Sequence, residues 1–280
     1  MNNANLYKKS NVLQKRDAKE IIEEFSSIFN WKWDGSSDAL LDIGCGSGDV
    51  LYELILPKIP INIEVIGIDI SKEMIKYANE HYGNEYLKFY KVDIESEMFI
   101  DGKTTPIKPE SFNFITSFYA LHWIQNQRQA LSNIHKLLKP NGTCLLVFLV
   151  SNPIYDVYTH LSRMKKYSRY MSDVEKFISP YHYEEKPLEV FESTLTHVGF
   201  KISHIEIRDQ IFIYENVDLL KYSVAAVNPF TIRMPESLQN EFLNDYVKKI
   251  DDLNLIRFNE NTFTKDVFTP YKLMVAVINK

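Results

Sequence analysis

The 280-residue sequence has only two cysteines, no long hydrophobic run and no excess of basic residues. Cys45 and Cys144 are too few for a disulfide framework and lack the spacing of a zinc site, so we expect a reducing, cytoplasmic setting. A net charge of −5 argues against nucleic acid as the main partner, because surfaces that bind phosphates are basic. No cluster of residues has metal-ligand spacing, so we expect no metal.

Membrane insertion is also not expected. The longest apolar run, "CLLVFLV", is too short to span a bilayer. The start of the chain, "MNNANLYKKS", is polar and does not resemble a signal peptide.

Up to residue 150, apolar runs alternate with amphipathic stretches. Helical periodicity is found in four stretches, residues 14–29, 48–58, 71–83 and 126–142. Five short apolar runs are typical of strands, residues 39–44, 64–70, 87–94, 111–120 and 143–150. Near-continuous apolar strands separated by amphipathic helices indicate a parallel sheet covered on both faces. The sequence therefore predicts one α/β domain with a core at about 36–150.

Beyond residue 150 the alternation stops, and we interpret residues 151–186 and 215–268 as insertions that form a mostly helical cap. Strand-like stretches at 201–214 and 271–280 flank the second insertion. The first insertion is rich in aromatic residues, namely Tyr155, Tyr158, Tyr167, Tyr170, Phe177 and Tyr181. These rings could line an apolar pocket, or they could form the small core that any insertion needs. Both interpretations stay open at this point.

The stretch "LLDIGCGSG" places three glycines directly after the first predicted strand, where open parallel sheets bind ligands. A dinucleotide-binding turn would need glycine at position 49, but Asp49 stands there and would repel a pyrophosphate. The lysine and hydroxyl residue of a P-loop are also absent from this turn. The turn therefore suits close approach by a ligand without phosphates.

Acidic residues stand at the ends of successive predicted strands. Asp69 ends the second strand, where a carboxylate can accept hydrogen bonds from a ribose diol. Asp93 ends the third, where it can accept from an adenine amino group, with Ile94 against the ring. Asp42 lies beneath the glycine turn. Three acids around an adenosine favour a cationic ligand, and S-adenosylmethionine is such a ligand.

Four residues near the end of the fourth strand could face a transferred methyl group: Ser117, Tyr119, His122 and Trp123. His122 could serve as a general base, or it could be a hydrogen-bonded structural histidine. Methyltransferases that act on amino groups of nucleic acids carry a motif like Asn-Pro-Pro-Tyr after this strand. The similar "NPIY" here follows the fifth strand instead, so we interpret it as a turn of the cap.

In this order, "LLDIGCGSG", "VIGIDISKEMIKYA", "VDI", "FITSFYALHW" and "LLKPNG" resemble the motifs of class I S-adenosylmethionine-dependent methyltransferases over residues 39–150. The resemblance implies a Rossmann-like sheet with helices on both faces. It also implies S-adenosyl-L-methionine as methyl donor and S-adenosyl-L-homocysteine as product. The cofactor-binding residues implied by the motifs are Asp42, Gly44, Cys45, Gly46, Gly48, Asp69, Ile70, Met74, Asp93, Ile94 and Ser117.

A closer resemblance covers nearly the whole chain. The start "MNNANLYKKSNVLQKRDA", the stretch "SFYALHWIQNQRQALSNIHKLLKPNGTCLLVFLVSNPIYDVY", "FISPYH" and "SVAAVNPF" are similar to insect juvenile hormone acid O-methyltransferases. That family implies carboxyl methylation of juvenile hormone acids or farnesoic acid. Its active-site glutamine and tryptophan correspond to Gln14 and Trp123, with helix 14–29 lying over the active site.

The chemistry of this reaction agrees with those two residues. A carboxylic acid is ionised at neutral pH, so the reaction needs alignment and exclusion of water rather than a strong base. A Gln amide and a Trp N–H are neutral donors that orient a carboxylate without binding the ground state too tightly. Two alternatives stay open, a methyltransferase for another apolar acid or a phenol, and a non-catalytic cofactor-binding protein. A homodimer is a further possibility.

Overall fold

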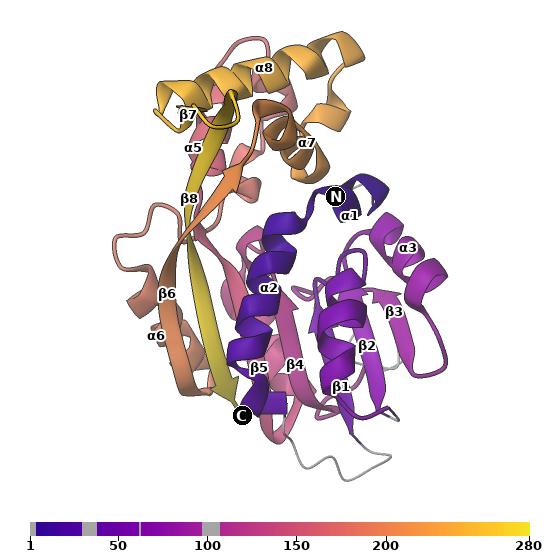
Figure 1. Ribbon diagram of the computed structural model, residues 1–280. Helices are drawn as coiled ribbons and strands as arrows, with labels where there is room; N and C mark the ends of the chain where they lie inside the picture. Colours follow the sequence, from indigo (N-terminus) through magenta and orange to yellow (C-terminus); the bar gives the residue numbers. More distant parts are fainter. Residues whose placement is uncertain (1–3, 30–37, 62, 97–106) are drawn as a thin grey trace.

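The computed structural model describes residues 4–29, 38–61, 63–96 and 107–280. A twisted sheet forms the centre, with helices on both of its faces and a helical cap beyond one end (Figure 1). The expected start of the core near residue 36 lies outside the described residues. Among the described residues, no helix combines the length and the hydropathy needed to cross a bilayer.

The sheet has the strand order β3-β2-β1-β4-β5-β8-β6, and β7 pairs with β8. Neighbouring strands from β1 to β5 are parallel, whereas β8 runs antiparallel to β5, β6 and β7. The strands are β1 (Ala39–Ile43), β2 (Glu64–Asp69), β3 (Leu87–Lys91), β4 (Phe112–Phe118), β5 (Leu138–Ser151), β6 (Lys201–Tyr214), β7 (Ile256–Asn259) and β8 (Thr264–Asn279). The parallel sheet predicted up to residue 150 is confirmed for β1 to β5, and β8, which lies beyond that range, is added as an antiparallel strand. The order of the strands is that of the Rossmann-like sheet implied by the resemblance. The chain order reverses between β1 and β4, the position at which such sheets bind ligands.

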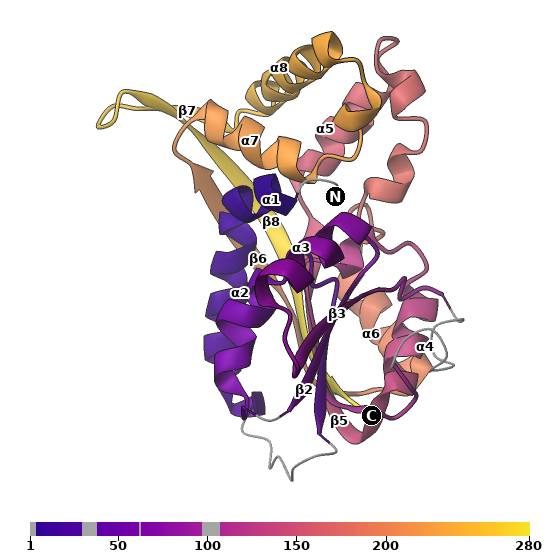
Figure 2. The ribbon, with the colours of Figure 1, turned by 90° about the vertical axis from the view of Figure 1, so that its right-hand side faces the viewer.

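Helices bury both faces of this sheet, which explains the near-continuous apolar strands. Helices α2 (Val12–Glu24) and α3 (Lys72–Tyr82) and the π-helix η2 (Leu51–Ile55) pack on one face. Helices α4 (Gln127–Leu137) and α6 (Pro187–Val198) pack on the other face (Figure 2). Each face thus has its own hydrophobic cluster.

Several helix boundaries differ from the sequence prediction. The expected helix 14–29 begins earlier, at Val12, and ends at Glu24, followed by the 3-10 turn η1 (Ser26–Phe29). The expected helix 126–142 ends at Leu137, and Leu138 already pairs with Phe112 in the sheet. The physical reason is Pro140, which disfavours helical geometry at the preceding residue. The expected N-cap of α3 is confirmed, because the Ser71 hydroxyl accepts the N–H of Met74.

The cap has a hydrophobic cluster of its own, built from α5 (Pro153–Ser162), α7 (Val217–Val227) and α8 (Glu236–Asp252). Tyr158 and Tyr167 are fully buried in it. The 3-10 helices η6 (Ser168–Tyr170) and η7 (Val174–Phe177) follow α5, and η8 (Thr231–Arg233) connects α7 to α8. Part of the aromatic content of the first insertion is therefore the core of the cap. Residues 256–268, expected in the cap, mainly form the β7–β8 hairpin.

An element that the sequence did not predict, α1 (Ala4–Ser10), lies between the core and the cap. It contacts α3 on one side and α7 on the other, as both views show (Figures 1 and 2). Lys8 Nζ donates to the Tyr82 hydroxyl of α3 at 2.8 Å, and the Ser223 hydroxyl of α7 donates to the Ser10 carbonyl. The N-terminal segment therefore links the cap to the sheet.

Candidate active site

Two cavities meet at the carboxyl ends of the parallel strands. The sheet-end cavity follows β1, β2 and the segment after β3, and its lining includes Gly44, Asp69, Ile70, Asp93 and Ile94. The cap cavity lies between the N-terminal segment, the end of β4 and the cap. Tyr119 and Trp123 line both cavities, so the two spaces share a wall.

The glycine turn after β1 is held tightly against the loop after β4. Gly44 has a φ of +72°, a conformation that side chains disfavour, and a Cβ there would lie 2.1 Å from the Cβ of Ala120. The N–H groups of Gly44 and Cys45 both donate to the Ile68 carbonyl, at 2.7 and 3.0 Å. Glycine at position 44 is therefore required by the backbone geometry and by the packing.

Asp69 lines the sheet-end cavity and also holds the turn together. One carboxylate oxygen accepts the N–H of Gly46 at 3.0 Å, and the other accepts the N–H of Ser71 at 2.8 Å. The side chain is buried, and this burial raises the pKa of the Asp69 carboxyl. Each carboxylate oxygen retains a further lone pair for a hydroxyl donor. The sequence analysis predicted the ribose contact of Asp69 but not its hydrogen bonds to the backbone N–H groups of Gly46 and Ser71.

Asp93 and two isoleucines complete one side of the sheet-end cavity. The Asp93 side chain is exposed, and its Oδ1 accepts the N–H of Glu95 at 3.0 Å. Ile70 is 63% exposed, which is unusual for an isoleucine, while Ile94 is buried. Two apolar side chains and a carboxylate at neighbouring strand ends can hold a flat, amino-bearing ring.

The remaining predicted cofactor residues do not line this cavity among the described residues. Asp42 accepts the Thr116 hydroxyl at 2.7 Å, and burial raises its pKa to about 7. The Ser117 hydroxyl donates to the Ile43 carbonyl at 2.9 Å, which ties β4 to β1. Cys45, Gly46 and Gly48 lie in the turn itself, and Met74 is buried in the first turn of α3, where its N–H donates to the Ser71 hydroxyl. A residue's position at the end of a predicted strand therefore does not tell whether its side chain lines the sheet-end cavity or lies beneath it.

The two predicted catalytic residues meet at the cap cavity. Gln14, in the first turn of α2, lines it, and Trp123, in the 3-10 helix η5 (Leu121–Trp123), lines it as well. The Oε1 atom of Gln14 is buried and has no hydrogen-bond partner among the described residues. This oxygen is an acceptor, and a 180° rotation of the side-chain amide would put the NH2 donor in its place, so Gln14 can present either group to a ligand.

Tyr119 lies between the cavities in a strained conformation. Its φ of +56° is in the left-handed region, which costs roughly 1–2 kcal/mol for a residue with a side chain. Its hydroxyl donates to the buried carboxylate of Asp17. Tyr119 was one of the four residues predicted near the methyl group, but its partner Asp17 was not predicted.

His122 lines the cap cavity as a neutral side chain. It is buried, and this desolvation lowers its pKa to about 3. Its Nδ1 accepts the N–H of Leu149 at 3.4 Å. A base with so low a pKa is weak, and the geometry favours the structural histidine over the general base.

The N-terminal segment supplies further residues that the sequence analysis missed. Tyr7 lines the cap cavity, with a ring carbon 3.6 Å from where a Gly46 Cβ would lie. The Asn11 amide donates to Asp49 at 2.9 Å, and Lys15 Nζ lies 3.3 Å from the same carboxylate. Asp49, which replaces a glycine of the dinucleotide turn, therefore anchors this segment. The polar stretch gave no periodic signal by which these contacts could have been found.

No group of three or more His, Cys, Asp or Glu side chains arranged for a metal ion occurs in the described part of the chain. Cys45 and Cys144 are both free and buried.

Comparisons with known proteins agree with this geometry. A family model described as a methyltransferase domain matches residues 34–208. A juvenile hormone acid O-methyltransferase of Drosophila melanogaster is 45% identical over 285 residues, covering 100% of this chain and 93% of that protein. The Bombyx mori protein of the same name is 41% identical over 263 residues, covering 93% of this chain and 91% of its own. The crystal structure of the Bacillus subtilis YcgJ protein has the same fold, with a TM-score of 0.56, 19% identity and coverage of 95% and 98% of the two chains.

The fold and the matched domain define this chain as a methyltransferase of the Rossmann-like class. The chain belongs to the family of juvenile hormone acid O-methyltransferases, which confirms the resemblance found in the sequence.

Asp42 generates a prediction about stability and pH. Its pKa of about 7 in the folded protein is above the ordinary value of 3.8. Between these values the folded state keeps a proton that the unfolded chain releases, so this group destabilises the fold as the pH rises from 5 to 8. We therefore expect the Tm of Asp42→Asn minus the Tm of wild type to be about 3 °C or more greater at pH 8 than at pH 5.

Differential scanning calorimetry of the ligand-free protein measures this difference. Asp209→Asn, which changes an exposed carboxylate on β6, is the control and should show no such dependence. An Asp42→Asn shift that is equal at both pH values would contradict the prediction.

Proposed function

We propose that the protein transfers a methyl group from S-adenosyl-L-methionine to the carboxylate of a juvenile hormone acid or of farnesoic acid. One observation carries the proposal: an acid-lined cavity and a largely apolar one share Tyr119 and Trp123, and neither contains a lysine or arginine among its described lining residues. The relatives in Drosophila melanogaster and Bombyx mori are named for methylation of juvenile hormone acid, which supports the substrate.

The sheet-end cavity suits the adenosine of a cationic cofactor. Asp69 would accept the ribose hydroxyls, and Asp93 would accept from the adenine amino group, with Ile70 and Ile94 against the ring. When bound, the cofactor supplies an electrophilic methyl group on sulfur and leaves as S-adenosyl-L-homocysteine. Gly44 lets the ligand approach the backbone of the turn closely.

The cap cavity suits the acid. Its carboxylate is already ionised, so the protein has to orient one oxygen and exclude water. Gln14 and Trp123 carry neutral N–H donors in this cavity. Leu220, Val224 and Ile250 line the cavity on the cap side and provide an apolar surface for the rest of the molecule.

The same geometry favours an acid over a phenol. A phenol has a pKa near 10 and would need a base at neutral pH. The histidine in the cap cavity, His122, has a pKa lowered to about 3 and cannot serve efficiently as that base.

Product analysis tests the function directly. The protein is incubated with methyl-labelled S-adenosylmethionine and a panel of sesquiterpenoid acids, other apolar acids and phenols, and the products are identified by mass spectrometry. We expect labelled methyl esters of the sesquiterpenoid acids. Labelled ethers of phenols, esters of other acids only, or no product would each overturn the proposal. Cytoplasmic location and a homodimer remain further predictions, which fractionation and sedimentation would measure.

Asp69 should be needed for cofactor affinity. Because its two carboxylate oxygens also accept two backbone N–H groups, Asp69→Ala should lower Tm as well as binding. Asp69→Asn keeps the size of the side chain and one acceptor oxygen, so it is the milder change. Loss of a charge-assisted hydrogen bond of about 1.5–3 kcal/mol predicts roughly ten- to a hundredfold weaker binding of S-adenosylmethionine. Isothermal titration calorimetry measures this, with the exposed neighbour Glu73→Gln as control. If Asp69→Asn and wild type bound S-adenosylmethionine with equal affinity, the assignment of Asp69 to the ribose hydroxyls would be wrong.

Gln14 and Trp123 should contribute to the rate rather than to folding. The loss of one donor to a carboxylate, about 1.5–3 kcal/mol, predicts a kcat/KM that is roughly ten- to a hundredfold lower in Gln14→Ala and in Trp123→Phe. Gln239→Ala, on α8 outside both cavities, is the control. Steady-state kinetics together with melting temperatures decide the question. Wild-type kcat/KM in both variants would exclude the proposed roles.

The length of the acid should matter strongly. Each methylene buried in the cap cavity contributes about 0.8 kcal/mol, so kcat/KM should fall steeply from farnesoic acid to shorter acids. Val224→Phe, which reduces the cavity, should impair the long acids more than the short ones. A competition assay across a chain-length series measures both effects. Equal efficiency for farnesoic acid and acetate would refute an apolar pocket.

A further inference from the structure

A buried carboxylate outside the lining of both cavities joins three distant parts of the chain. Asp17 of α2 is 1% exposed. Its Oδ2 accepts the Tyr119 hydroxyl at 2.5 Å and the Tyr271 hydroxyl of β8 at 2.6 Å. Its Oδ1 accepts Nε and Nη2 of Arg16, at 3.0 and 2.9 Å. Both oxygens are thus fully used within the protein.

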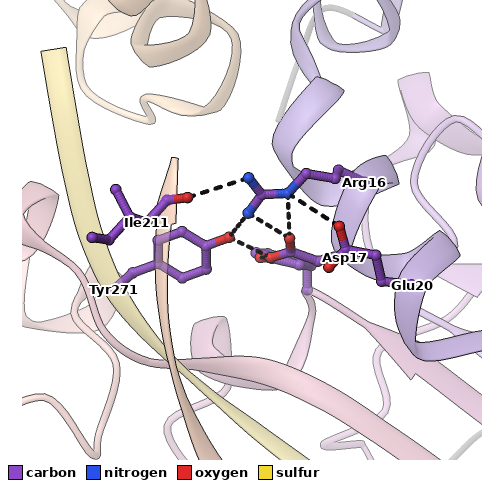
Figure 3. Close-up of polar contacts among 6 residues, drawn as sticks. Arg16, Asp17, Glu20, Ile211 and Tyr271 are labelled. Atoms are coloured by element: carbon purple, nitrogen blue, oxygen red, sulfur yellow. Dashed lines mark hydrogen bonds and ion pairs between the residues drawn. The ribbon is translucent and has the colours of Figure 1, made fainter. Parts of the chain in front are cut away.

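Arg16 extends this cluster to the sheet. Figure 3 shows its guanidinium between Asp17, the Tyr271 hydroxyl and the Ile211 carbonyl. The contacts to the last two are 2.6 and 3.2 Å. A buried charge is costly unless it is paired and hydrogen-bonded, and here every partner is fixed on a regular element or a packed loop. The cluster therefore holds α2 firmly against β8 and β6.

The cluster is connected to both sides of the candidate active site. Gln14 lies three residues before Asp17, so the two are neighbours along one face of α2. Tyr119, whose hydroxyl Asp17 accepts, lines both cavities. The same carboxylate thus fixes the helix that carries Gln14 and the ring that separates the two ligands.

We propose that Asp17 is a positioning residue for methyl transfer, which sets Gln14 and Tyr119 relative to each other through its hydrogen bonds to Tyr119 and Tyr271. This inference rests on the proposed function. The Oε1 of Gln14 has no partner among the described residues, so no hydrogen bond at this oxygen fixes the amide, and the position of α2 helps to place it. A misplacement of about 1 Å in an aligned reaction can reduce the rate roughly a hundredfold.

The test uses the full chain with S-adenosylmethionine and the best acid of the product panel. Tyr271→Phe removes one hydroxyl from Asp17 at a residue that lines neither cavity within the described chain. We expect kcat to fall about five- to fiftyfold, because alignment is lost. The cofactor Kd should stay within twofold. Asp17→Asn, which keeps the size of the side chain, should lower kcat at least as much.

A matched control separates positioning from stability. Tyr167 is also buried, and its hydroxyl also donates to a carboxylate, that of Asp245 at 2.7 Å, but it lies in the cap cluster. Tyr167→Phe should lower Tm by an amount similar to Tyr271→Phe while kcat stays within twofold of wild type.

A double variant tests the route through Gln14. If the cluster acts by placing the Gln14 amide, Tyr271→Phe should reduce kcat by less than twofold in a Gln14→Ala background. The inference would be overturned if the double variant lost kcat by the product of the two single-variant fold-reductions. A Tyr271→Phe protein as active as the Tyr167→Phe control would overturn it as well. A wild-type protein that binds the cofactor but forms no methyl ester would instead overturn the proposed function, so the two failures are distinguishable.

Discussion

The contact between Gly44 and Ala120 fixes the relation between the two halves of the site. A single added methyl group at position 44 would lie 2.1 Å from Ala120, so the turn after β1 and the loop after β4 pack with no spare room. The same loop carries Tyr119, His122 and Trp123. Close packing at this point thus sets the distance between a ligand on the glycine turn and a ligand in the cap cavity, which a displacement reaction requires.

The core fold was predictable because its signals are local. Apolar runs and amphipathic periods gave the strands and helices, and the position of Asp69 and Asp93 at strand ends placed them at one edge of the sheet. Other features depend on contacts between distant residues. Asp17 meets Tyr119 and Tyr271 across 102 and 254 residues, and α1 is held by Tyr82 and Ser223. No periodicity in one segment can reveal such partners.

The aromatic residues of the first insertion show a second limit of prediction from sequence, because composition does not tell which rings line a cavity. Composition indicated either an apolar pocket or a small core, and the structure uses the rings for both. Tyr158 and Tyr167 are buried in the cap cluster, whereas Tyr155 and Phe177 line the two cavities. A helical face turned toward a cavity and one turned toward a neighbouring helix have the same apolar pattern, so the sequence alone cannot separate them.

The charges of the two cavities complement each other in a way that the reaction needs. Acidic side chains gather where a cation would bind, and the cap cavity has neutral donors where an anion would bind. A lysine or arginine beside the acid would stabilise the ionised ground state, whose charge is lost as the ester forms, and would slow the step. Burial lowers the pKa of His122 and keeps its ring uncharged, so it adds no positive charge that would stabilise the carboxylate ground state. The attraction between the two ligands themselves can then bring the carboxylate oxygen toward the methyl group, while the protein supplies alignment and a dry cavity.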